Sequence, residues 1–171
     1  CARAQLPVAA GKQIAMSNAA WKIFIPNSYY QRTNNTADVL VHFHGDPQTV
    51  WNNAKYANLN TIIVTVNYSG LSSAYSAPFS NASLFQSLLN EALDKVADEA
   101  FIPDALQWDK IAVSSFSAGY GAVREILKSP AYRDDIDVRN HLAHALVDFR
   151  FAQAMLTGVG GEFFRRIARR E

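Results

Sequence analysis

The sequence has few of the features that would tie it to a membrane, a nucleic acid or an oxidising compartment. Cys1 is the only cysteine in 171 residues, so an internal disulfide is excluded. No run of about 18 apolar residues occurs, and a membrane span is not expected. Charged residues make up 18% of the chain and the net charge is +1, which gives no indication of nucleic-acid binding. The 49% of hydrophobic residues suits one globular domain.

The first residues carry a weak targeting signal. Ala2-x-Ala4 resembles the small-residue end of a signal peptide, which predicts a secreted or periplasmic protein whose mature chain starts near Gln5. A lipidated Cys1 and an arbitrary fragment boundary are the alternatives. Residues 1–20 are therefore treated as an N-terminal segment that precedes the folded core.

Apolar patterning predicts strands that alternate with helices. Strands are predicted over 21–26, 38–45, 61–68 and 110–116, and helices over 47–57, 81–100 and from 118 to about 127. This alternation predicts an α/β fold, a three-layer α/β/α sandwich with a mainly parallel sheet, over residues 21–137. In such sheets the active crevice lies at the carboxyl ends of the strands.

One serine stands where a predicted strand meets a predicted helix. Ser117 has the small residues Ser115, Ala118, Gly119 and Gly121 around it. This pattern is typical of a nucleophile elbow, Gly-x-Ser-x-Gly, with Ser115 in place of the first glycine. A serine hydroxyl needs an adjacent base and oxyanion donors to become a nucleophile. The alternative interpretation is a helix N-cap serine.

A second motif lies at the end of an earlier strand. The run 41–46, Val-His-Phe-His-Gly-Asp, is similar to the His-Gly turn of serine esterases. With the elbow, it makes residues 21–127 resemble the α/β-hydrolase superfamily. The resemblance implies a mechanism through an acyl-enzyme, no cofactor, and a small-molecule ester or acylated-sugar substrate.

The same resemblance assigns roles to individual residues. Ser117 would be the nucleophile, and the backbone N–H groups of Asp46 and Ala118 would form the oxyanion hole. His44 and Gly45 would shape the turn that carries Asp46. The sequence does not indicate an oligomeric state.

The remaining triad members have no clear place. The superfamily order is nucleophile, acid, histidine, which leaves Asp137 with His141 or His144. Residues 138–171 form an atypical tail, predicted to be helical. From residue 139 it has six arginines, no lysine and a net charge of +3, against −2 for residues 1–138. We interpret this as a truncated or frame-altered C-terminus, or as a short variant with a basic tail. On the first interpretation, we expect the hydrolase fold to be incomplete at this end.

Two further interpretations remain open. His42, His44 and Asp46 also match the His-x-His-x-Asp zinc motif of the metallo-β-lactamase superfamily, although Pro47 stands where that family has another histidine. The second is a catalytically inactive, hydrolase-like binding module. The predicted loop after residue 68 carries tyrosines, Tyr68 and Tyr75, that either stack on an acyl or sugar group or cover the sheet edge.

Overall fold

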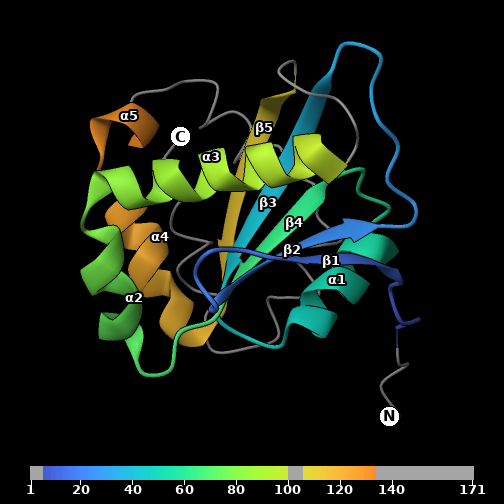
Figure 1. Cartoon of the computed structure of the whole chain (residues 1–171). Coiled ribbons are helices and arrows are strands. Elements are labelled where there is room, and N and C mark those ends of the chain that lie inside the picture. Colours follow the sequence, from blue (N-terminus) through green and yellow to red (C-terminus); the bar gives the residue numbers. More distant parts are fainter. Residues whose placement is uncertain (1–5, 100–105, 134–171) are drawn as a thin grey trace, which may run out of the picture.

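The computed structural model describes residues 6–99 and 106–133 and shows an α/β fold (Figure 1). The strands are β1 (Gly11–Ala15), β2 (Trp21–Pro26), β3 (Thr36–Phe43), β4 (Ile62–Val66) and β5 (Gln107–Ser115). The helices are α1 (Pro47–Tyr56), α2 (Ser72–Phe79), α3 (Ala82–Glu99), the short 3₁₀ helix η1 (Ser117–Gly119), α4 (Tyr120–Ile126) and α5 (Pro130–Arg133). Among the described residues, no helix is both long and apolar enough to span a membrane.

The five strands form one mixed sheet in the order β1-β2-β4-β3-β5. The pairs β4–β3 and β3–β5 are parallel, and the pairs β1–β2 and β2–β4 are antiparallel. The prediction of a mainly parallel sheet was therefore wrong. The reason is that β2 runs against β4, and β1, which the sequence patterning did not predict, pairs beside it as an antiparallel edge strand.

The helices cover both faces of the sheet, as a three-layer arrangement requires. Adjacent residues of one strand face opposite layers, so Ile23 packs with α2, α3 and α4 while Phe24 packs with α1. On the α1 side, the rings of Phe24 and Trp51 stack with centroids 4.3 Å apart. In Figure 1, α2, α3 and α4 gather on one side and α1 lies apart from them.

The long helix α3 shows why the spacing of apolar residues predicted this element correctly. Its buried residues recur at helical spacing on one face: Phe85, Leu88, Leu89, Ala92 and Val96. Asn81 precedes the helix, and its side-chain oxygen accepts from the Ser83 N–H at 3.1 Å. This is the N-cap arrangement that satisfies a backbone donor of the first turn.

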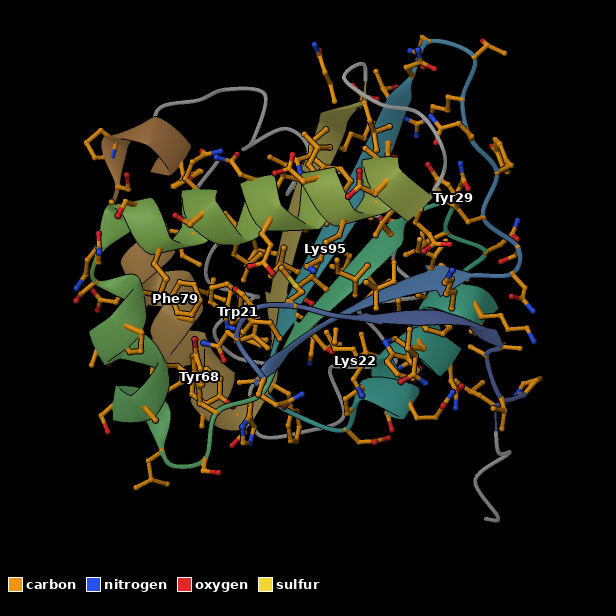
Figure 2. The ribbon with its side chains drawn as sticks, viewed as in Figure 1. Trp21, Lys22, Tyr29, Tyr68, Phe79 and Lys95 are labelled. Atoms are coloured by element: carbon orange, nitrogen blue, oxygen red, sulfur yellow. The ribbon has the colours of Figure 1, made fainter. Side chains whose placement is uncertain are left out.

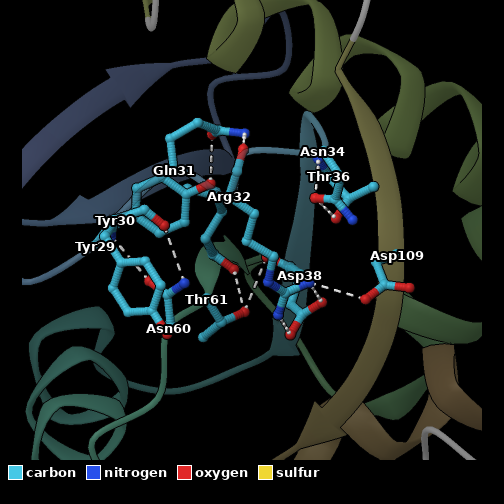
Figure 3. Close-up of polar contacts among 11 residues, drawn as sticks. Tyr29, Tyr30, Gln31, Arg32, Asn34, Thr36, Asp38, Asn60, Thr61 and Asp109 are labelled. Carbon is cyan, nitrogen blue, oxygen red and sulfur yellow. Dashed lines mark hydrogen bonds and ion pairs between the residues drawn. The ribbon is translucent and has the colours of Figure 1, made fainter.

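An ion-pair cluster connects β3 and β5 near their amino ends (Figure 3). Arg32, in the loop between β2 and β3, donates to both carboxylate oxygens of Asp38, at 3.0 and 2.6 Å, and to Asp109 at 2.8 Å. Because Asp38 belongs to β3 and Asp109 to β5, one planar guanidinium joins two parallel strands. The carboxyl ends of the same strands lie at the opposite end of the sheet.

Candidate functional site

Ser117 lies directly beyond the carboxyl end of β5, at the turn into η1 and α4. The chain is still extended at Phe116, whose N–H donates to the Phe43 carbonyl of β3 at 3.0 Å. At Ser117 it turns sharply, with φ of +44°, a left-handed conformation that few residues other than glycine adopt. The side chain of Ser117 is exposed. The turn thus presents this hydroxyl at the surface, above the end of the sheet.

The small residues after Ser117 are required by close packing. A Cβ at Gly119 would lie 2.1 Å from the carbonyl oxygen of Phe43, and a Cβ at Gly121 would lie 2.3 Å from that of Ser72. Both contacts are with backbone atoms, which cannot swing away as a flexible side chain can. The new helix therefore passes against β3 and the start of α2 at distances that only glycine allows.

The turn after β3 approaches this elbow. His44 and Gly45 both have positive φ, +68° and +120°, and the Gly45 N–H donates to the side-chain oxygen of Asn67 at 3.0 Å. A Cβ built on Gly45 would lie 3.8 Å from the Cβ of Phe116. Asp46 follows and caps α1, its carboxylate accepting from the Thr49 N–H at 2.9 Å.

Behind this turn, the buried ring of His42 holds its backbone. Nε2 of His42 contacts the His44 carbonyl at 2.9 Å, and Nδ1 contacts the Ser114 hydroxyl at 2.8 Å. A carbonyl only accepts, so Nε2 carries the proton and Nδ1 accepts from Ser114. Burial lowers the pKa of His42 to about 4, so the ring is neutral at pH 7.

A second contact holds the His44 side chain. Its Nδ1 lies 2.8 Å from the hydroxyl of Tyr75 on α2, which also bonds the backbone of Tyr68. Tyr75 is fully buried, which excludes stacking of this ring on a bound ligand and leaves the other alternative, that it covers the sheet edge. Tyr68 in turn accepts from the Trp21 indole N–H at 2.9 Å and packs near Phe79, as Figure 2 shows.

These supporting residues, Asn67, Tyr75 and Ser114, were not identified as site residues from the sequence. Each reaches the turn from a different element, so no local motif joins them. The segment with Tyr75 was predicted to be a loop, whereas it forms α2. The only sequence signal was that Asn67 and Ser114 are polar residues near the ends of predicted strands. Tyr75 had no such signal.

The zinc interpretation finds no support in this geometry. Within the described ranges, no cluster of three or more histidine, cysteine or acidic side chains is placed to hold a metal. Both ring nitrogens of His42 are already bonded, as is Nδ1 of His44, and Asp46 caps a helix.

The predicted acid and histidines, Asp137, His141 and His144, lie outside the described residues, as does the tail 138–171. What the structure brings together is therefore the elbow with Ser117, Ala118 and Gly119, and the turn with His44, Gly45 and Asp46. Both stand at the carboxyl ends of the parallel strands β3 and β5.

Comparison with known proteins adds only a distant likeness. No protein-family model and no curated protein matches the chain. The siderophore hydrolase EstB from Aspergillus nidulans is similar with a TM-score of 0.42 and 14% identity, over 77% of this chain and 55% of that one. An arylesterase structure is similar with a TM-score of 0.38 and 19% identity, over 77% of this chain and 43% of that one. The chain thus spans about half the length of these two proteins, and a likeness of this strength establishes neither a family nor an activity.

Proposed function

We propose that this protein is a serine hydrolase that cleaves a carboxylic ester, with Ser117 as the nucleophile. The observation that carries the proposal is the exposed Ser117 at φ +44° between a parallel strand and a helix. A non-glycine residue in this region costs of order 1–3 kcal/mol, and such strain is concentrated at functional sites. A helix N-cap serine would instead have an extended backbone. The alternative of a simple cap therefore does not explain the conformation.

The oxyanion donors would be the backbone N–H groups of Asp46 and Ala118. Asp46 follows the His44–Gly45 turn, and a Cβ built on Gly45 would lie within van der Waals distance of Phe116, the residue before Ser117. No hydrogen bond from either N–H is found among the described residues, so both remain available to an oxygen. One such donor contributes about 3 kcal/mol to stabilising the transition state.

The chemistry needs a base for the serine proton. The Ser117 oxygen forms a bond to the ester carbonyl carbon while its proton passes to a histidine, for which we propose His141 or His144, oriented by Asp137. The tetrahedral intermediate then expels the alkoxide, which takes that proton, and water hydrolyses the acyl-enzyme in the same manner. The substrate would be a small-molecule ester or an acylated sugar.

A fluorophosphonate probe tests the nucleophile directly. We expect stoichiometric labelling that is lost in Ser117→Ala and kept in Ser87→Ala. Ser87 is exposed on α3, and within the described part of the chain its hydroxyl bonds only the Ser83 carbonyl. Circular dichroism of each variant checks that it is folded. Absence of labelling in the folded unmodified protein would refute the proposal and favour the non-catalytic binding module.

A further inference from the structure

The hydroxyl of Tyr75 makes three contacts, and their chemistry fixes where each proton lies. It lies 2.9 Å from the Tyr68 nitrogen, 3.0 Å from the Tyr68 carbonyl oxygen and 2.8 Å from Nδ1 of His44. A phenol has one proton to donate and two lone pairs that accept. The Tyr68 carbonyl can only accept, so it takes the phenol proton. The two lone pairs are then left for the Tyr68 N–H and for His44, whose Nδ1 must therefore carry a proton.

This assignment determines the other nitrogen of His44. In a neutral imidazole, one nitrogen donates and the other accepts. With Nδ1 protonated, Nε2 is the acceptor, and it has no hydrogen-bond partner among the described residues. His44 is half-buried, so Nε2 is not sealed inside the core.

The acceptor is also held in place. The His44 N–H donates to the Val66 carbonyl at 2.9 Å, and the His44 carbonyl accepts from His42. The His44 ring meets the Tyr75 ring edge-on and lies parallel to Phe116, with an angle of 8° and centroids 6.4 Å apart. Since Phe116 directly precedes Ser117, the ring that carries this acceptor lies close to the elbow.

From this arrangement we infer that Nε2 of His44 is a substrate-recognition acceptor, which selects esters that carry a free hydroxyl close to the scissile bond. The inference rests on the proposed function and narrows its substrate class, which then includes partially acylated sugars and 2-hydroxy esters. A group placed to bond a substrate hydroxyl discriminates against the analogue without it, because the acceptor then loses its partner. Because His44 is only half-buried, water can replace the hydroxyl, and we expect discrimination of about tenfold.

The test uses full-length Ser117→Ala protein with ¹⁵N-labelled histidines, so that binding is observed without turnover. The His44 signals are assigned by their loss in His44→Asn, a residue that tolerates the positive φ. We expect a protonated Nδ1 and an unprotonated Nε2 on His44. In Tyr75→Phe, which lacks the hydroxyl that selects this tautomer, we expect both neutral tautomers of His44. Titration with ethyl lactate should shift the Nε2 signal, and ethyl propionate, which lacks the hydroxyl, should not. The signals of His42 are the internal control, since both its nitrogens are already bonded.

A proton on Nε2 instead of Nδ1, or equal shifts with the two esters, would overturn the inference. If Ser117 is labelled by the fluorophosphonate, kcat/KM should favour the lactate ester about tenfold in the unmodified protein and not in His44→Asn. Failure of the proposed function appears as absent labelling of Ser117. Failure of the recognition role appears in the histidine spectra, so the two are distinguished.

Discussion

Replacing Gly119 by alanine should destabilise the protein, although its backbone conformation is one at which Gly→Ala typically stabilises. Gly119 has φ of −63° and ψ of −17°, ordinary helical values at which alanine carries no backbone strain. Where the backbone is compatible, Gly→Ala typically stabilises by about 0.4–1 kcal/mol, because the unfolded chain loses freedom. Here the new Cβ would lie 2.1 Å from the Phe43 carbonyl oxygen. This contact must be relieved by a shift of α4 or β3, so the sign of the effect reverses.

The expected magnitude follows from the cost of overpacking. Inserting a methyl group into a packed interior typically costs about 1–3 kcal/mol. Because the Cβ is attached rigidly to the backbone of one element and meets a backbone oxygen of another, we expect the upper part of this range for Gly119→Ala. In a chain of this length, that lowers the Tm by roughly 5–10 °C. Thermal and urea unfolding measure it, and slower fluorophosphonate labelling should accompany it because the elbow moves with the helix.

Gly45→Ala is the matched control, because its cost has a different origin. A Cβ there meets nothing closer than 3.8 Å, but φ is +120°, so the penalty is conformational. Asparagine should give no relief there, because it tolerates the left-handed region near about +57° and not a φ of +120°, so Gly45→Asn should be as damaging as Gly45→Ala. Gly119→Asn should be at least as damaging as Gly119→Ala, because its side chain is larger. A stabilised or unchanged Gly119→Ala would refute the packing argument.

Three further predictions concern the groups that fix the ends of the sheet. Arg32→Lys keeps the charge but loses the planar fork that joins Asp38 and Asp109, and should cost about 1 kcal/mol in urea unfolding; Arg32→Lys as stable as the parent would contradict this. The pKa of His42 is about 4 in the folded protein, below its unfolded value near 6.5. The neutral ring therefore contributes about 3 kcal/mol to the free energy of unfolding above pH 6.5, and this contribution is lost as the pH falls toward 4. Its NMR signals should therefore show a neutral ring at pH 5, and a protonated ring there would refute it. Ser114→Ala leaves Nδ1 of that ring without a partner and should cost about 1–3 kcal/mol in urea unfolding, whereas Ser114→Thr should not.

Much of the α/β pattern could be predicted from sequence because the core elements have strong local periodicity. The residues of β4 are all buried, which produces the continuous β-branched run that indicates a strand covered on both faces. The buried residues of α3 recur at helical spacing. Two elements lack such a signal. The strand β1 has no fully buried residue, and α2 is short, with Pro78 inside it and mostly small residues.

The candidate site, too, could be predicted from the sequence only in part. The strand-to-helix position of Ser117 and the turn at Gly45 were visible in the sequence, because glycine and small residues mark sharp turns locally. The contacts that hold the turn were not visible. His42 and Ser114 are 72 residues apart, and His44 and Tyr75 are 31 apart, so only the parallel pairing of β3 with β5 and the packing of α2 bring them together.

The two ends of the sheet differ in how they respond to ionic strength. At the amino ends, the cluster of Arg32 with Asp38 and Asp109 depends on full charges that are partly exposed, which dissolved salt screens. At the carboxyl ends, the His44–Gly45 turn is held by hydroxyl, amide, imidazole and backbone groups. Salt should therefore loosen the end that faces away from Ser117 and leave the geometry around the serine unchanged. At high salt concentration, the protein should therefore lose stability before the geometry of its candidate site changes.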